Sequence, residues 1–239
     1  MSIDVNRRFY REAAAVAEGD VWRIALDGKL VKTPARNPLM VPTRVLAEAI
    51  AAEWNAQETK VKPDTMPLMQ LGSTAIDRVA PDRDRIIAET AGYAVTDLVC
   101  YRAESPADLV ARQAAQWDPL IDWLRERYDV SLKVASGVIA IPQSDQALAA
   151  LTRAVAAQPD LRLTALAVMT GAAGSLAIGL AVLEGRISPE TAAAAAQLDE
   201  LFQAERWGLD PEAEKRRAIQ KADLVAARRF LDLLATGTA

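Results

Sequence analysis

The 239-residue chain contains no histidine and only one cysteine, Cys100. The absence of histidine excludes Ser-His-Asp and Cys-His catalytic groups and any imidazole ligand for a metal ion. A single cysteine excludes an intrachain disulfide and a cysteine-based zinc cluster. The apolar residues next to Cys100 favour a buried structural thiol over a reactive one. We therefore expect neither a catalytic residue of these classes nor a metal site.

Phosphate-binding motifs are missing too, because neither a Walker-type nor a dinucleotide-type glycine loop occurs. The glycine-rich stretch 171–175 has no lysine after it and lies in an apolar segment, so helix packing is its better interpretation. A net charge of −4 argues against nucleic-acid binding, which relies on a basic surface. The sequence thus predicts no cofactor and no nucleic-acid partner.

One long uncharged run, residues 163–183, requires a test for membrane insertion, since about 20 apolar residues can span a bilayer. Glycine, alanine and hydroxyl residues dilute the run, so a helix over 161–184 buried in a helical core is expected. A membrane-associated accessory protein is kept as an alternative, although no stable membrane insertion is expected. Residues 1–10 lack an apolar signal core, which favours the cytoplasm.

The first 75 residues carry most of the strand signal. Alternating runs flank Asp27-Gly28, a pair typical of a tight hairpin turn. The strands are predicted at residues 21–26, 29–33 and 39–41. From Thr43, a candidate N-cap, apolar residues recur at helical spacing. We predict a small β-rich N-terminal domain with one helix over 1–75.

Residues 76–239 are predicted to form a larger, mostly α-helical C-terminal domain, which makes the fold class α+β. Helices are expected at 67–80, 83–96, 105–128, 144–157, 161–184, 189–207 and 211–235. Three pairs with a capping oxygen before proline mark helix starts, namely Ser105-Pro106, Ser188-Pro189 and Asp210-Pro211. Two short apolar runs, 130–134 and 137–141, are predicted to be extended segments that can pair.

Carboxylate pairs give the enzyme alternative. Asp118 and Asp122 lie one helical turn apart, and Asp82 and Asp84 are near neighbours, but their surroundings favour solvated helix faces. Asp97 and Arg102 are the pair that a carboxylate-based enzyme of unknown substrate would use.

The segment around residues 198–208 has two possible roles. Helical spacing places two stripes side by side, Asp199, Phe202 and Arg206 beside Glu200, Gln203 and Trp207. One interpretation is a helix end whose Phe and Trp belong to the core. The other is an acidic, amide and aromatic patch for a protein partner, because tryptophan is enriched at binding hot spots.

A series of short motifs occurs in order along about 200 residues. They are Arg8-Phe9-Tyr10, Leu26-Asp27-Gly28-Lys29, Lys32-Thr33-Pro34, residues 39–43, Ala52-Glu53-Trp54 with Gln57, Met66-Pro67-Leu68, residues 74–77, Thr96-Asp97-Leu98 with Tyr101-Arg102, Gln116-Trp117, Phe202-Gln203 and Trp207-Gly208. Together they resemble the assembly chaperones for the α subunit of the F-type ATP synthase, a family of mitochondria and some bacteria.

The resemblance implies a two-domain protein without catalytic activity, which binds the unassembled α subunit and prevents its aggregation until the β subunit takes its place. An assembly chaperone need not self-associate, so we expect a monomer. The absence of a presequence fits a bacterial member in the cytoplasm, with family counterparts in the mitochondrial matrix. An acidic residue before the Phe-Gln pair is important in the family, and Asp199 or Glu200 occupies that place. The implied partner-binding residues are Asp199, Glu200, Gln203, Trp207 and Trp54, the last of which also closes an apolar helix face.

Overall fold

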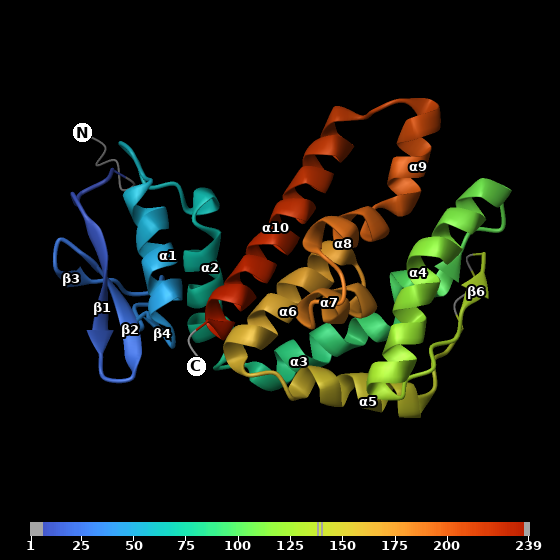
Figure 1. The fold of residues 1–239 in the computed structure, drawn as a ribbon, viewed down its shortest axis with the longest axis horizontal. Coiled ribbons are helices and arrows are strands. Elements are labelled where there is room, and N and C mark those ends of the chain that lie inside the picture. Colours follow the sequence, from blue (N-terminus) through green and yellow to red (C-terminus); the bar gives the residue numbers. More distant parts are fainter. Residues whose placement is uncertain (1–6, 138, 140, 237–239) are drawn as a thin grey trace. The chain divides into compact units, whose positions relative to one another are not determined.

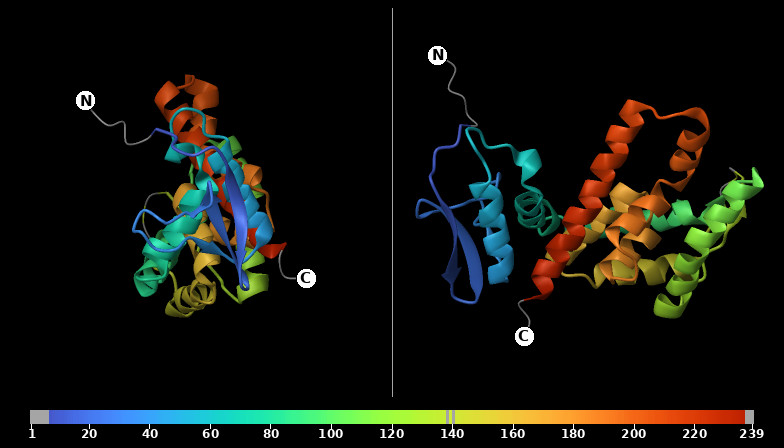
Figure 2. Two further views of the ribbon diagram at one scale, coloured as in Figure 1. Left: turned by 90° about the vertical axis from the view of Figure 1, so that its left-hand side faces the viewer. Right: turned by 45° about the horizontal axis from the view of Figure 1, so that its top comes forward.

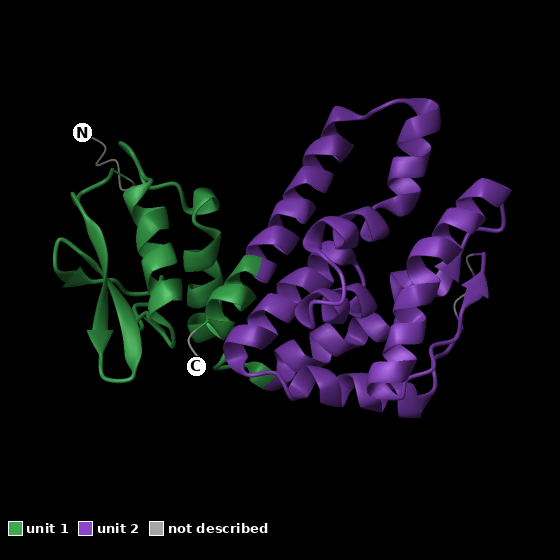
Figure 3. Cartoon of the chain, in the orientation of Figure 1, with its two compact units in different colours: residues 1–83, 229–239 green, residues 84–228 purple. Residues whose placement is uncertain are grey.

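The computed structural model describes residues 7–137, 139 and 141–236 (Figure 1). The chain divides into two compact units, residues 1–83 with 229–239, and residues 84–228 (Figure 3). The first unit carries a small sheet and the second is largely helical, which confirms the α+β fold class. The domain limits 1–75 and 76–239 stay a prediction.

The sheet of the first unit is built on β2 (Val21–Leu26). It pairs antiparallel with β1 (Ala13–Glu18), β3 (Lys29–Leu30) and β4 (Met40–Val41). The predicted hairpin turn is present, with φ of 46° at Asp27 and 81° at Gly28. Strand β1 was not predicted, because its run of alanines has low strand propensity and only pairing with β2 makes it extended.

Helix α1 (Arg44–Asn55) packs on the sheet, and α2 (Pro67–Thr74) lies on the other side of α1 (Figures 1 and 2). As predicted, the Thr43 hydroxyl caps α1 by accepting from the Leu46 N–H at 3.2 Å. The carboxylate of Glu53 accepts from the N–H groups of Leu68 and Met69 at 2.8 and 2.9 Å. A carboxylate at the N-terminus of α2 satisfies N–H groups that have no partner within the helix, and it complements the helix dipole. Glu53 therefore joins α1 to α2.

Beyond α2 the backbone continues as a π-helical turn, Ala75–Val79. The first unit also includes the end of α10 (Pro211–Ala235), from Arg229 onward. Asp77 on the π-helical turn holds the loop that follows β3. Its carboxylate accepts from the Thr33 hydroxyl at 2.6 Å, the Ala35 N–H at 2.9 Å and the Asn37 amide at 2.8 Å. This loop is therefore anchored to the π-helical turn through one side chain.

The second unit is a set of packed helices. Its helices are α3 (Arg83–Gly92), α4 (Ala107–Tyr128), α5 (Asp145–Ala156), α6 (Asp160–Ala173), α7 (Leu176–Leu183), α8 (Pro189–Ala196), α9 (Leu198–Trp207) and the first part of α10. Short 3-10 turns at Tyr93–Thr96 and Leu98–Cys100 follow α3. All eight residues of α7 are buried, and α4, α6 and α8 pack around it.

The prediction of a single helix over 161–184 was wrong. The chain breaks between α6 and α7, where Gly174 takes a φ of 64° and the Ser175 hydroxyl caps α7. The two helices pack against each other. None of the helices within residues 7–137, 139 and 141–236 combines the length and hydrophobicity that a bilayer span requires. The uncharged run is therefore two buried helices.

Other boundaries also differ from the sequence predictions. The helix expected over 189–207 is interrupted at Gln197, between α8 and α9. Ser188 caps α8 as predicted, whereas α4 begins after Pro106, which offers no side-chain cap. The expected pairing of 130–134 with 137–141 was wrong for the described residues. Instead β6 (Ala135–Ser136) pairs in parallel with β5 (Tyr101–Arg102), and residues 138 and 140 lie outside the described part.

The close approach of α6 and α7 depends on Gly179. A Cβ there would meet the Thr170 Oγ1 at 2.5 Å and its backbone N at 3.2 Å. We expect Gly179→Ala to lower the free energy of unfolding by about 1–3 kcal/mol, as overpacking does. Urea denaturation measures it, with Gly171→Ala as the control. At Gly171 a Cβ meets nothing closer than 3.9 Å, so alanine should be neutral or stabilising, and an equal loss would contradict the argument.

The Asp77 anchor predicts a pH dependence. Burial raises the pKa of Asp77, but the hydrogen bonds from Thr33, Ala35 and Asn37 together hold it below 3.8. A lowered folded-state pKa adds stability that is present above the unfolded pKa and is lost as the pH falls through the folded pKa. Between pH 6 and pH 3, the wild type should therefore lose more thermal stability than Asp77→Asn. Parallel melting curves for the two proteins would contradict this.

Candidate functional site

Helix α9 is attached to α4 through one of its two stripes. Asp199 accepts a hydrogen bond from the Gln113 amide of α4 at 2.7 Å, and Phe202 is buried between the two. At the end of α9, Arg206 pairs with Asp108 of α4 at 2.6 Å. Its guanidinium also lies over the Phe202 ring, 4.2 Å from the centroid. This stripe therefore fixes the orientation of α9.

The other stripe faces α10 across a groove, called the α9–α10 groove below. Its volume is about 420 Å³, and its larger lining side chains are Glu200, Gln203, Trp207, Asp210, Arg216 and Arg217. The loop between the two helices begins at Gly208, whose φ of 95° suits glycine and ends α9. Figure 2 shows this loop joining α9 to α10. Four of the five predicted partner-binding residues belong to α9, and three of them line the groove.

Large apolar side chains are exposed at this end of the unit. The side chain of Trp207 is 85% exposed and that of Leu209 is 66% exposed. The interpretation that places both Phe202 and Trp207 in the core is therefore wrong for Trp207. Exposed tryptophan next to charged side chains is the composition of a protein-binding surface.

The structure distinguishes the two acidic residues that the sequence left open. Asp199 is half-buried and tied to Gln113, so its carboxylate serves packing between α9 and α4. Glu200 is exposed and lies 3.1 Å from Arg216 and 3.5 Å from Arg217 of α10. Arg217 is buried, so Glu200 also balances a charge that has little contact with water.

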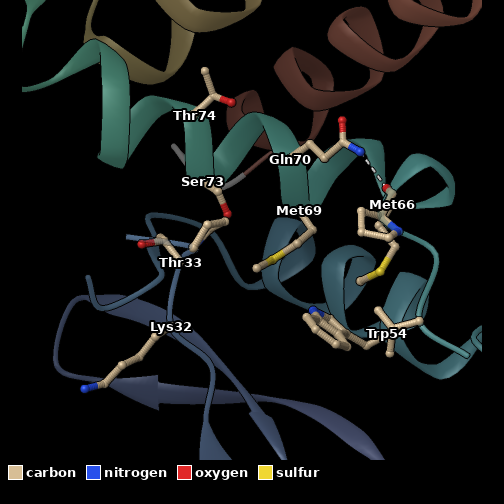
Figure 4. Close-up of a pocket in the computed structure, with 11 residues that line it drawn as sticks. Lys32, Thr33, Trp54, Met66, Met69, Gln70, Ser73 and Thr74 are labelled. Carbon is tan, nitrogen blue, oxygen red and sulfur yellow. Dashed lines mark hydrogen bonds between the residues drawn. The ribbon is translucent and has the colours of Figure 1, made fainter. Parts of the chain in front are cut away.

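Trp54, the fifth predicted residue, belongs to α1 in the other unit. The Tyr10 hydroxyl donates to its carbonyl oxygen at 2.6 Å, and the Tyr10 ring contacts the indole edge-on. The guanidinium of Arg8 donates to the carbonyl oxygens of Tyr10, at 3.0 Å, and of Gln57. The half-buried indole of Trp54 also lines a cavity of about 370 Å³ (Figure 4).

Sequence reasoning missed several residues at these two places. Arg216 and Arg217 line the α9–α10 groove, while Met69 and Ser73 line the cavity beside Trp54. No local motif marks them, because their role depends on the packing of two helices. Three of the short motifs, Lys32-Thr33-Pro34, Ala52-Glu53-Trp54 and Met66-Pro67-Leu68, contribute residues to the lining of the cavity.

Asp97 and Arg102, the pair considered for an enzyme, have other partners in the fold. Asp97 is buried and accepts from the Ser175 hydroxyl at 2.6 Å and the Ala177 N–H at 3.0 Å. Arg102 pairs with Asp118 at 2.7 Å rather than with Asp97. Burial raises the pKa of Asp97, while the hydrogen bonds from Ser175 and Ala177 oppose that shift. The Asp97–Arg102 pair of the enzyme alternative is therefore not formed.

Cys100 is buried, and burial raises the pKa of its thiol to about 12, with the Asp97 charge acting in the same direction. A thiol with such a pKa is protonated near neutral pH, which confirms the structural interpretation of Cys100. Within residues 7–137, 139 and 141–236, no group of three or more cysteine or acidic side chains could hold a metal ion.

The exposure of Trp207 predicts that it contributes little to folding. We expect Trp207→Ala to change the free energy of unfolding by less than about 0.5 kcal/mol, as at other exposed sites. Trp117→Ala is the matched control, because Trp117 is buried and donates to the Ala195 carbonyl at 2.9 Å. That substitution should cost about 3–5 kcal/mol. Comparable losses in chemical denaturation would show that Trp207 belongs to the core.

The sequence and the structure of this chain are similar to those of known proteins. A family model described as "ATP12 chaperone protein" matches residues 7–125. The crystal structure of Atp12 from Paracoccus denitrificans is similar with a TM-score of 0.91 and 42% identity, covering 96% of this chain and 98% of that one. A mutant of P. denitrificans Atp12p matches with the same TM-score and 41% identity over the same shares of the chains.

A curated relative, "Protein atp12, mitochondrial" from Schizosaccharomyces pombe, is 26% identical over 214 residues, which are 84% of this chain and 74% of the relative. The sequence and structural matches thus agree along most of the chain. They confirm the assembly-chaperone resemblance of the ordered motifs, and the chain belongs to the ATP12 chaperone family.

Proposed function

We propose that this protein is an ATP-independent assembly chaperone that binds the unassembled α subunit of the F-type ATP synthase. It prevents aggregation of this subunit and releases it to the β subunit. Membership of the ATP12 chaperone family supports a role in ATP synthase assembly. The observation that carries the proposal is the exposed apolar surface of Trp207 and Leu209 beside the α9–α10 groove.

The chemistry of the groove suits a protein client. Subunits of an alternating ring expose large interfaces when they are unpaired, and such surfaces aggregate. Trp207 offers a large apolar contact, while Glu200 and Arg216 offer charges for orientation. A chaperone that covers an aggregating surface lowers the free concentration of the aggregating species. Release needs no ATP when the β subunit binds the same surface more tightly.

The predicted residues take different roles in this proposal. Glu200, Gln203 and Trp207 contact the client, because they line the groove. Asp199 is a positioning residue that holds α9 against α4 through Gln113. Trp54 offers a separate contact in the other unit.

The proposal includes no catalytic activity and no cofactor. The protein acts as a monomer, since one copy carries the whole groove. Its compartment in a bacterium is the cytoplasm, beside the soluble head of the synthase, and the name of the S. pombe relative gives the mitochondrial counterpart.

Suppression of aggregation tests the function and the site together. Light scattering by isolated α subunit should fall when the wild-type protein is added at an equimolar ratio. Glu200→Lys reverses the charge in the groove, so we expect it to weaken α-subunit binding by about tenfold, or about 1.4 kcal/mol. Glu214→Lys is the matched control, because Glu214 is exposed on α10 and does not line the groove.

Each outcome has a clear meaning. Failure of the wild type to suppress scattering overturns the chaperone proposal. Equal affinities for Glu200→Lys and Glu214→Lys overturn the role of the groove. A thermal denaturation curve for each variant separates lost binding from lost folding, since Glu200 also balances Arg217.

A further inference from the structure

Two adjacent arginines of α10 line the α9–α10 groove, and they share one carboxylate of α9. Arg216 donates a hydrogen bond to Glu200 Oε2 at 3.1 Å, whereas the guanidinium of Arg217 lies 3.5 Å from the same oxygen. Glu200 thus forms its closer pair with Arg216 and only a longer contact with Arg217. Two positive charges therefore face one negative charge at this place in the groove.

Arg217 differs from Arg216 in its burial. The side chain of Arg217 is 9% exposed, compared with 57% for that of Arg216. A guanidinium carries five N–H donors and no acceptor. Within the described part of the chain, the guanidinium of Arg217 has no partner besides Glu200, and its nitrogens are not sealed from the groove. A buried charge with so few partners favours a ligand that brings acceptors into the groove.

The position of Arg217 is fixed by contacts that leave its guanidinium open. The Gln197 amide, at the junction of α8 and α9, donates to the Arg217 carbonyl oxygen at 3.0 Å and to the Gln220 side-chain oxygen at 3.3 Å. Asp210, the other carboxylate of the groove, accepts from the Glu212 N–H at 3.1 Å at the start of α10. The donors of Arg217 are therefore held in place before a ligand arrives, which lowers the entropy cost of binding.

The charge balance indicates the class of ligand. A guanidinium fork matches the two oxygens of a carboxylate, and charge-assisted pairs of this kind are strong. One surplus positive charge suits a monoanion, whereas a phosphate dianion would meet stronger repulsion from Glu200. Trp207, which lines the same groove and is 85% exposed, offers an apolar surface. The groove therefore suits an acidic side chain of a polypeptide with an apolar group beside it.

We propose that Arg217 recognises the client, because its guanidinium binds the carboxylate of an aspartate or glutamate side chain that enters the α9–α10 groove. Arg216 keeps its pair with Glu200, and Trp207 covers the apolar group next to the acidic side chain. Glu200→Lys repels both guanidinium groups, so it disturbs this site although it adds positive charge. The carboxylate as ligand follows from the groove, whereas its identification with the client rests on the proposed function.

A dipeptide tests the chemistry of the groove without the client. The full-length protein labelled with ¹⁵N is titrated with N-acetyl-leucyl-glutamate α-amide at about pH 6, where the glutamate side chain is ionised. The Nε–H signal of Arg217 is assigned with Arg217→Lys. We expect a saturable shift of this signal at millimolar dipeptide. N-acetyl-leucyl-glutamine α-amide, which has the same shape without the charge, should leave the signal in place.

Two results of this titration would overturn the site. One is the absence of a shift with the glutamate dipeptide, and the other is an equal shift with both dipeptides. Inorganic phosphate is titrated as a further probe. A larger saturable shift with phosphate than with the glutamate dipeptide would overturn the carboxylate as the ligand.

A pair of variants then tests the client. Arg217→Gln removes the buried charge and, when folded by its melting curve, should weaken binding of isolated α subunit about tenfold, as loss of a charged hydrogen bond does. Lys215→Gln is the matched control, because Lys215 is exposed on α10 and does not line the groove. This control should bind like the wild type. Wild-type affinity of folded Arg217→Gln overturns the role of Arg217.

Competition with the wild-type protein gives the same test without a substitution. Excess glutamate dipeptide should weaken α-subunit binding, whereas the glutamine dipeptide should not. If the glutamate dipeptide shifts the Arg217 signal but does not compete, the client is not the ligand. Lack of α-subunit binding by the wild type overturns the proposed function, and with it the client as the ligand. The dipeptide titration then still decides whether the groove takes a carboxylate.

Discussion

The helical unit depends on a single buried carboxylate, which fixes the start of α7 where the chain turns between α6 and α7. Asp97 receives hydrogen bonds from the Ser175 hydroxyl, the Ala177 N–H and the Val99 N–H, at distances from 2.6 to 3.2 Å. Helix α7 is entirely buried, so the free N–H groups at its start have no water to bind. The Asp97 carboxylate provides acceptors there and ties the start of α7 to the segment after α3. Helices α4, α6 and α8 then pack around α7.

That core leaves α9 with one occupied face and one open face. Phe202 and Asp199 attach the helix to α4, whereas Glu200 and Trp207 stand on the side of α10. The buried face with Phe202 stabilises the position of α9, whereas the exposed face with Trp207 adds little to folding stability. The exposed side chain of Trp207 can persist because the opposite side of the same helix is well packed.

The first unit shows the same division between two adjacent residues. Glu53 holds the start of α2 through two backbone N–H groups, while Trp54 lines the cavity between α1 and α2. Burial raises the pKa of Glu53, and the N–H donors of Leu68 and Met69 oppose this. The Glu-Trp motif thus combines Glu53, which holds the start of α2, with Trp54, which lines the cavity.

The sequence alone determined the α+β class, the Asp27-Gly28 hairpin, the Thr43 and Ser188 caps and the two stripes of α9, because turns, caps and helical spacing are local properties. Its ordered motifs also predicted the family. Only the tertiary structure extended the alanine-rich strand β1, which requires its partner β2. The split of 161–184 into α6 and α7 likewise needed Asp97, 78 residues from Ser175 in sequence. The different surroundings of Asp199 and Glu200, and the assembly of the α9–α10 groove, were decided by which helices pack together. Such contacts between distant residues leave no pattern in the local sequence.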